Sequence, residues 1–216
     1  MKISPEEQYK FVKLSLPNGD KAEGYSVLLH ACCAPCSSAI VECMLRNGMK
    51  PTVFFSNSNI YPQKEYEIRK QEIIRFLKEK GVPYVEDEYD HEDWREYIKG
   101  LEQEPERGSR CSKCFQFRLQ RAACYAQEHG FHLLTTTLAS SRWKNIQQID
   151  EAGKKAVSNY PDVEWWEQNW RKGGLQMRRG ELLRLYQFYN QLYCGCEFSL
   201  ASSPAMQKAK EEEEKA

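Results

Sequence analysis

The chain has 216 residues, of which 41% are hydrophobic and 29% charged, and its 31 basic residues balance 31 acidic ones. These numbers describe a soluble globular protein with a substantial core, and no apolar run approaches the roughly 20 residues that a membrane helix needs. The N-terminal residues lack the apolar segment of a secretory signal, so we expect a cytoplasmic protein without a membrane partner. In that reducing compartment, cysteines spaced as Cys-x-x-Cys favour metal binding or catalysis over disulfides.

Three segments are expected along the chain. Residues 1–24 are polar and should form an N-terminal arm with a turn at residues 17–20. Residues 25–203 should form a single α/β domain that carries the catalytic residues. Residues 204–216 are rich in Lys, Glu and Ala, and we expect a frayed or disordered tail there.

Apolar runs and turn residues predict alternating strands and helices in the central segment. Short apolar runs indicate four buried strands, at residues 27–30, 51–55, 82–85 and 131–136. Capping and stop signals indicate helices from Ser37 or Ser38 to Arg46 and over residues 64–80, 94–98, 114–128, 145–158 and 181–193, with irregular structure over 161–180. This alternation is typical of a mostly parallel sheet, here followed by a helical C-terminal part.

Thiol and polar side chains follow each predicted strand. Cys32 and Cys33 follow the first strand, Asn57 the second, Asp90 the third and Thr136 the fourth. In open α/β sheets, ligands bind outside the carboxyl ends of the strands. We therefore expect the chemistry at this edge, where Asp90 could ligate a metal or supply a proton.

Seven of the nine cysteines fall into three clusters, Cys32-Cys33-x-x-Cys36, Cys111-x-x-Cys114 and Cys194-x-Cys196. Clusters so far apart in sequence indicate one thiolate metal site that the fold assembles from most of its length. A [4Fe–4S] cluster needs four thiolates, so the surplus is left for a second metal, a redox pair or a structural role. The isolated Cys43 and Cys124 are interpreted as small buried hydrophobic residues.

Basic and aromatic residues are grouped in two places. The segments Arg142-Trp143-Lys144 and Trp170-Arg171-Lys172 combine cations with aromatic rings, which suits a surface that binds phosphates and bases. A solvated face is the alternative interpretation. His30, at the end of the first strand, is expected to be a hydrogen-bonded core histidine or else to serve the site.

These motifs resemble the cobalamin-independent epoxyqueuosine reductases of the QueH type. The resemblance runs from about residue 27 to 200 and is carried by His30-Ala31-Cys32-Cys33-Ala34-Pro35-Cys36, Phe54-Phe55-x-Asn57-x-Asn59-Ile60-x-Pro62, Glu65-Tyr66-x-x-Arg69, Arg110-Cys111-x-x-Cys114-x-x-x-Arg118, Ser140-Ser141-Arg142-Trp143-Lys144-Asn145, Trp170-Arg171-Lys172-Gly173-Gly174 and Tyr193-Cys194-Gly195-Cys196. Position 58 is Ser where the family pattern has Pro.

The resemblance implies reduction of epoxyqueuosine to queuosine in the tRNA anticodon stem-loop, with an external electron donor. It implies a nucleotide-hydrolase-like (HUP-like) α/β fold. It also implies a [4Fe–4S] cluster held by the family cysteines, which fall on Cys32, Cys33, Cys111, Cys114, Cys194 and Cys196. Ligation by Cys36 or Asp90, and an additional iron beside the cluster, are left open.

Deoxygenation of an epoxide to an alkene takes two electrons and two protons and releases water. An iron–sulfur centre can relay the electrons, and an open iron position can polarise the epoxide oxygen. Asp90, Tyr61 or an unligated cysteine are the candidate proton donors.

Two other functions compete with this one. A tRNA sulfur transferase of the ATP-pyrophosphatase type should carry a glycine-rich phosphate loop after the first strand, and residues 32–36 contain no glycine. A zinc-stabilised RNA-binding module without catalysis would be colourless and redox-silent.

Overall fold

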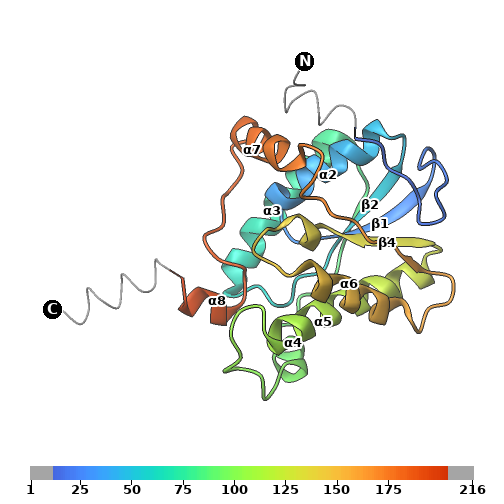
Figure 1. Ribbon diagram of the computed structural model, residues 1–216. Helices are drawn as coiled ribbons and strands as arrows, with labels where there is room; N and C mark the ends of the chain where they lie inside the picture. The colour runs from blue at the N-terminus through green and yellow to red at the C-terminus, as the bar shows by residue number, and fades with distance from the viewer. Residues whose placement is uncertain (1–11, 204–216) are drawn as a thin grey trace.

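The computed structural model describes residues 12–203 of the chain (Figure 1). Five parallel strands form one sheet in the order β3-β2-β1-β4-β5, with β1 and β4 near its centre. Their bounds are Ser26–Ala31 for β1, Lys50–Phe55 for β2, Tyr84–Glu86 for β3, Leu133–Thr136 for β4 and Glu164–Trp165 for β5. The parallel sheet expected from the sequence is confirmed, and its architecture is consistent with the HUP-like fold.

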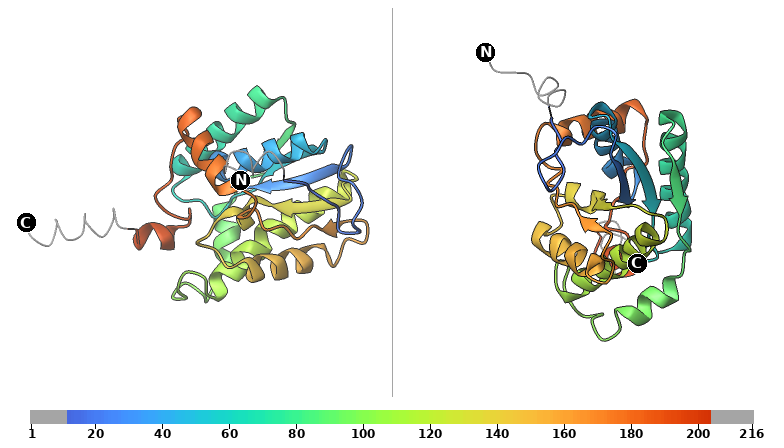
Figure 2. Two further views of the ribbon diagram at one scale, coloured as in Figure 1. Left: turned by 45° about the horizontal axis from the view of Figure 1, so that its top comes forward. Right: turned by 90° about the vertical axis from the view of Figure 1, so that its right-hand side faces the viewer.

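Helices cover both faces of the sheet (Figure 2). One face carries α2 (Ala34–Arg46), α3 (Gln63–Lys80) and α7 (Leu175–Leu185), and the other carries α5 (Ser109–Glu128) and α6 (Ile146–Val157). Three shorter elements lie near the carboxyl ends of the strands, namely α4 (His91–Tyr97), the 3-10 helix η1 (Thr137–Ser140) and α8 (Glu197–Ala201). Within the described part of the chain, no helix is both long and apolar enough to cross a membrane.

The side chains of β1 alternate between two hydrophobic cores. Val27 and Leu29 pack in the core beneath α2, α3 and α7, whereas Leu28 packs in the core beneath α5 and α6. All three are fully buried, as expected for a central strand with helices on both sides. The strand order reverses between β1 and β4, and such a switch point opens a crevice at the carboxyl ends of the strands.

The two helices that carry the first and second cysteine clusters begin earlier than the sequence predicted. α2 begins at Ala34 rather than at a serine cap, because Pro35 is well suited to the first turn of a helix and Cys33 takes the N-cap position. Ser37 donates a hydrogen bond to the carbonyl oxygen of Cys33 (2.7 Å). α5 begins at Ser109, so Cys111 and Cys114 both lie in its first two turns.

The prediction of one last helix over 181–193 is wrong. α7 starts at Leu175, after Gly174 has turned the chain with a positive φ of 77°, and it ends before Gln187, which has a φ of 49°. The segment predicted to be irregular also contributes β5 and the start of α7. Residues 186–196, here called the strap, are an irregular connection between α7 and α8 that carries the last cysteine cluster.

The N-terminal arm is partly described. Within the turn expected at residues 17–20, the amide of Gly19 donates to the carbonyl of Leu16 (2.9 Å), and Ser15 pairs with Lys21 in an antiparallel bridge. The rest of the arm, residues 1–11, and the tail expected at 204–216 lie outside the described residues.

Candidate active site in a cysteine-lined cavity

The first cysteine cluster lies where β1 passes into α2. Cys32 follows the strand, Cys33 is the N-cap of the helix, and Cys36 lies in its first turn. The three sulfur atoms lie within 4.8 Å of one another, and those of Cys32 and Cys33 are 3.7 Å apart. Cys33 and Cys36 are buried, so this trio forms a possible metal site.

The other two clusters face the same cavity, which encloses about 760 Å³. Cys111 comes from the start of α5, Cys194 from the strap and Cys196 from the N-cap of α8, and all three line the cavity with Cys32. Cys114 is 9% exposed and lies one helical turn below Cys111. The fold therefore brings cysteines of all three clusters to one cavity. Among the described residues, only Cys32, Cys33 and Cys36 form a group of three cysteines whose sulfur atoms lie within 4.8 Å of one another. Which of these thiols bind a metal stays a prediction.

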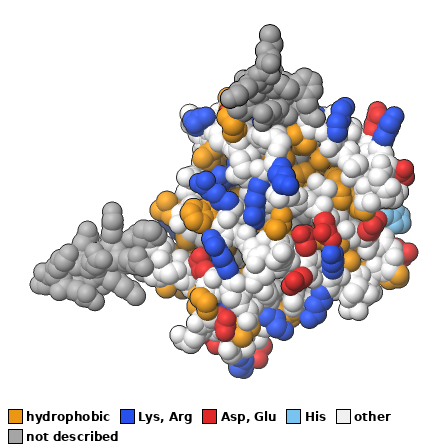
Figure 3. Space-filling model, viewed as in Figure 1, with side chains coloured by type: hydrophobic (Ala, Val, Ile, Leu, Met, Phe, Trp, Pro, Cys, Tyr) orange, Lys and Arg blue, Asp and Glu red, His pale blue; other side chains and the backbone are white. Residues whose placement is uncertain are grey.

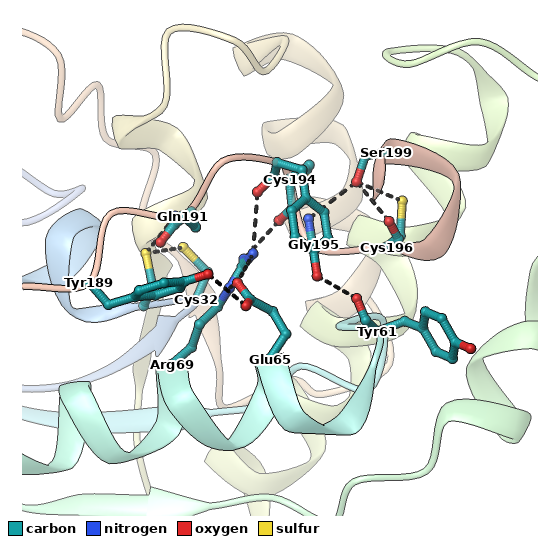
Figure 4. Close-up of polar contacts among 12 residues, drawn as sticks. Cys32, Tyr61, Glu65, Arg69, Tyr189, Gln191, Cys194, Gly195, Cys196 and Ser199 are labelled. Carbon is teal, nitrogen blue, oxygen red and sulfur yellow. Dashed lines mark hydrogen bonds and ion pairs between the residues drawn. The ribbon is translucent and has the colours of Figure 1, made fainter. Parts of the chain in front are cut away.

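A buried ion pair on α3 holds the strap in place (Figure 4). Arg69 donates to Glu65 within the helix (2.8 Å) and to the backbone carbonyls of Cys194 (3.1 Å) and Tyr193 (3.3 Å). The second carboxylate oxygen of Glu65 accepts a hydrogen bond from Tyr189 of the strap (2.8 Å). Because Arg69 is 2% exposed, its guanidinium is committed to these contacts rather than to solvent.

The end of the strap is fixed at the N-terminus of α3. The amide of Tyr61 donates to the carbonyl of Gly195 (2.8 Å), and the hydroxyl of Tyr193 donates to the carbonyl of Tyr61 (2.5 Å). Gly195 has a φ of 135°, and a Cβ there would lie 3.1 Å from the guanidinium of Arg69. Glycine is therefore the residue that permits this reversal between the two cysteines.

Beneath the first cluster lies a buried polar network. His30 is 0% exposed, and its ring nitrogens lie 2.7 Å from the hydroxyl of Thr136 and 3.1 Å from the carbonyl of Ser56. Arg118 donates to that same carbonyl (3.2 Å) and to the side-chain oxygen of Asn57. Burial, together with the positive charge of Arg118, lowers the pKa of His30 to about 3. His30 is thus the hydrogen-bonded, neutral core histidine of the first interpretation.

The electrostatics of the cavity favour negative charge. Its described lining includes one carboxylate, that of Glu106, against a larger set of cations, namely Arg69, Arg107, Arg110, Arg118, Arg142, Lys144 and Arg179. Such a lining stabilises thiolates and attracts polyanions.

Hydrogen bonds couple the thiols of the first cluster. Hydrogen bonds from Cys33 and Cys36 hold the pKa of Cys32 well below its ordinary value, although burial opposes this. The pKa of Cys36 is raised to about 11, first by its hydrogen bond to Cys32. Burial disfavours the charge of Lys144, but the charges of Cys194, Cys32 and Cys36 outweigh it and raise the pKa of this lysine. A thiolate beside two thiols is a donor set that a cation can bind.

Two of the predicted proton donors, Asp90 and Tyr61, lie outside the cavity lining. Asp90 accepts a hydrogen bond from the amide of Asp93 (2.9 Å) and caps α4, with its side chain exposed. The ring of Tyr61 stacks on His91 at a centroid distance of 5.3 Å and is 43% exposed. The catalytic roles of Asp90 and Tyr61 stay predictions.

The isolated cysteines behave differently from each other. Cys43 is 1% exposed in the core, as expected, and burial raises its pKa to about 11. Cys124 is only half-buried, and its sulfur lies 3.3 Å from a carboxylate oxygen of Glu128, so its interpretation as a buried hydrophobic residue is wrong.

The basic and aromatic group around residue 170 has a structural role in the fold. Trp170 is 1% exposed and packs edge-on against Trp166. Arg171 donates to the carbonyl of Lys144 (2.7 Å), which orders the loop beside the cavity. Of these residues, Lys172 is exposed.

Sequence reasoning did not assign a role to the residues that hold the strap. Glu65 and Arg69 are four residues apart, a spacing that pairs opposite charges on a helix. This spacing could have predicted the ion pair, but not its burial under a segment more than 120 positions away. The contact of Gln191 with the sulfur of Cys33 (3.1 Å) has no sequence signal at all.

Comparisons with known proteins agree with the motifs. A family model described as epoxyqueuosine reductase QueH matches residues 27–202. The chain is 48% identical over 190 residues to the epoxyqueuosine reductase QueH of Acinetobacter baylyi, which covers 88% of this chain and 85% of that protein. It is 46% identical over 204 residues to the protein of that name from Haemophilus influenzae, covering 94% and 82% of the two chains. It is 33% identical over 178 residues to that from Thermotoga maritima, covering 81% and 90%. The matched region contains all three cysteine clusters and the residues that hold the strap, so the chain belongs to the QueH family of epoxyqueuosine reductases.

Proposed function

We propose that this chain reduces the epoxide of epoxyqueuosine in the anticodon loop of tRNA to queuosine, and that the reaction takes place in the cysteine-lined cavity. The observation that carries the proposal is the convergence of three distant cysteine clusters on one cationic cavity of about 760 Å³. A cavity of that size suits one modified nucleoside, and its positive lining suits the phosphates of a tRNA.

The cofactor that we propose is an iron–sulfur centre. The donor set suits such a group, because cysteines from the end of β1, the start of α5 and the strap line one cavity, and the sulfur atoms of the first cluster, Cys32, Cys33 and Cys36, lie within 4.8 Å of one another. The residues that would hold it are Cys32, Cys33, Cys111, Cys114, Cys194 and Cys196. Cys36 joins the candidates, because it lies beside Cys32 and Cys33. When bound, the centre would supply single electrons from an external donor and an electrophilic iron for the epoxide oxygen.

The chain itself would provide charge, enclosure and protons. Arg118 and Lys144 place positive charge beside the thiolates, which favours the deprotonated sulfur that a metal binds. Two protons are needed for each epoxide oxygen that leaves as water. Of the proposed donors, Cys36 lines the cavity, and its raised pKa of about 11 keeps a thiol that binds no metal protonated at neutral pH. Asp90 and Tyr61 would have to act from outside the described lining.

The competing sulfur-transferase function is less well supported by the geometry. The loop between β1 and α2 holds Cys33 at the helix N-cap and Cys36 in its first turn, where a nucleotide-binding enzyme would need backbone amides free for phosphate. Instead, the amide of Cys32 donates to the hydroxyl of Thr137 (3.3 Å).

The test is to purify the protein anaerobically, measure iron, sulfide and zinc, and record its visible absorption. The iron-loaded protein is then given a chemical reductant and an anticodon hairpin that contains epoxyqueuosine, and mass spectrometry follows the loss of one oxygen. We expect a brown protein that converts the hairpin. A colourless, zinc-only protein that still converts it would overturn the cofactor, and iron-loaded protein that leaves the epoxide intact would overturn the reaction.

A further inference from the structure

One large aromatic side chain at the mouth of the cavity is left exposed. Trp143 is 69% exposed and belongs to the cavity lining, whereas the other four tryptophans, Trp94, Trp165, Trp166 and Trp170, are at most 7% exposed. An exposed indole is unfavourable in water and gives the fold no packing energy. A single exposed apolar residue can be incidental, so its surroundings decide its meaning.

The backbone of Trp143 is fixed to the wall of the cavity. Its carbonyl accepts a hydrogen bond from Arg107 (2.7 Å), and the carbonyl of Arg107 accepts one from Gln148 (2.8 Å). The amide of Arg107 in turn donates to the sulfur of Cys111 (3.2 Å). The position of the indole is therefore tied to the second cysteine cluster, while the ring itself extends into solvent.

The cations next to Trp143 fall into two groups. Lys144 lines the cavity and is half-buried. Arg142 and Arg107 are exposed, and the guanidinium of Arg142 lies 5.5 Å from the centroid of the Trp143 ring. Only the second group is available to a ligand outside the cavity.

The same face is both basic and apolar. Met177 is 52% exposed and Leu192 is 70% exposed, and both line the mouth with Trp143. Figure 3 shows Lys and Arg side chains next to hydrophobic ones on the part of this face below α7. An aromatic platform flanked by cations is the arrangement that binds single-stranded nucleic acid, because bases stack on the ring and phosphates pair with the cations.

We propose that Trp143 stacks on a nucleobase of the RNA loop that enters the cavity, and that Arg107 and Arg142 bind the adjacent phosphates. The inference rests on the proposed function only in taking the substrate to be an RNA loop. RNA explains this face better than an electron-donor protein does, because RNA would use both the Trp143 ring, for stacking on a base, and the exposed Arg107 and Arg142, for binding phosphates. Trp143 would then act as a positioning residue that holds the target nucleotide over the thiols.

The fluorescence of Trp143 provides the direct test. Because the other tryptophans are buried, collisional quenching by acrylamide reports Trp143, and Trp143→Phe should remove the quenchable fraction. We expect an unmodified RNA hairpin with the anticodon loop sequence to protect the iron-loaded protein from quenching. Protection by a reduced electron-carrier protein instead of the hairpin would overturn the proposal and assign this face to the donor.

Affinity for the same hairpin gives a second, independent readout. We expect Trp143→Ala to weaken binding about tenfold, equal to about 1.4 kcal/mol and within the range for one base–aromatic stack. Trp143→Phe should retain most of the affinity, because the phenyl ring still stacks. Leu185→Ala is the matched control, since Leu185 is 68% exposed and does not line the cavity. Unchanged affinity of Trp143→Ala would overturn the role.

The salt dependence separates stacking from phosphate contacts. Arg142→Gln should reduce the slope of log affinity against log salt by about 0.7, as expected for one lost contact to a single strand, whereas Trp143→Ala should leave the slope unchanged. A slope unaffected by Arg142→Gln would overturn the phosphate contact. Because the hairpin carries ordinary guanine, these outcomes do not depend on turnover, and a failure of the proposed reaction is recognised separately by the mass-spectrometric assay.

Discussion

Replacement of Arg69 by methionine should detach the strap from α3. Methionine keeps much of the length of the side chain but removes the donors to Glu65 and to the carbonyls of Cys194 and Tyr193. The carboxylate of Glu65, 7% exposed, would then keep the Tyr189 hydroxyl as its partner but lose its counter-charge. The cysteine pair of the strap would lose its support on the side of α3.

The size of the effect follows from burial. Removing one partner of a buried ion pair costs about 3–5 kcal/mol, and much of this is the penalty for the charge left behind. The two carbonyls also lose charge-assisted hydrogen bonds, each of which contributes about 1.5–3 kcal/mol, although these terms are not additive. We expect Arg69→Met to lose about 3–5 kcal/mol. The double variant with Glu65→Gln should recover about 1–2 kcal/mol of this, because no unpaired carboxylate remains.

Three measurements check this expectation. Anaerobic urea unfolding gives the loss of stability, and metal analysis should show less iron per chain. The amide of Tyr61, which donates to the carbonyl of Gly195 (2.8 Å), reports the strap locally and should exchange its hydrogen faster. Lys78→Met, at an exposed position of the same helix, is the matched control. Wild-type iron content with unchanged Tyr61 exchange in Arg69→Met would refute the role of the ion pair.

Three further outcomes are expected. Cys111→Ala should lose iron and activity, whereas Cys43→Ala should keep both, because Cys43 lies in the apolar core away from the cavity; equal losses would contradict this partition. His30, with its pKa lowered to about 3 from an ordinary 6.5, binds fewer protons folded than unfolded. The stability that it contributes is therefore complete above pH 6.5 and is lost at up to ~1.4 kcal/mol per pH unit as the pH falls towards 3. Urea unfolding at several pH values should show a smaller slope for His30→Gln than for the wild type. Gly153→Ala would place a Cβ 2.2 Å from Trp165 and should lower the melting temperature without changing iron content per folded chain.

The sheet could be predicted because its strands are short apolar runs that end in turn residues. β1 and β2 were expected within one residue or so of their observed bounds, and α3 ends at Gly81, which has the left-handed conformation that favours glycine after a helix. The edge of the sheet that carries the candidate site followed from the parallel order alone, and Asn57 donates a hydrogen bond there to the carbonyl of Ala31 (2.9 Å).

The helix starts near the cysteines were harder to predict. The segment before Cys111 is polar and contains Gly108, which is typical of a loop, yet α5 begins at Ser109. Tertiary contacts explain the difference, because Arg110 donates to backbone carbonyls of Glu102 and Glu104 and folds the preceding loop against the helix. Contacts of this kind override local propensity and leave no periodic pattern in the sequence.

The strap was beyond sequence reasoning for a physical reason that also bears on the metal site. Residues 186–196 have no regular secondary structure, and the contacts that place Cys194 come from Arg69 and Tyr61, far away in the chain. A segment held by a few long-range polar contacts opens more easily than a packed helix. A centre bound by Cys32, Cys111 and Cys194 together would bridge β1, α5 and the strap, so its binding energy would oppose that opening. The proposed cofactor and the Arg69–Glu65 pair would thus stabilise the same closed arrangement, and each should make loss of the other less damaging to the fold.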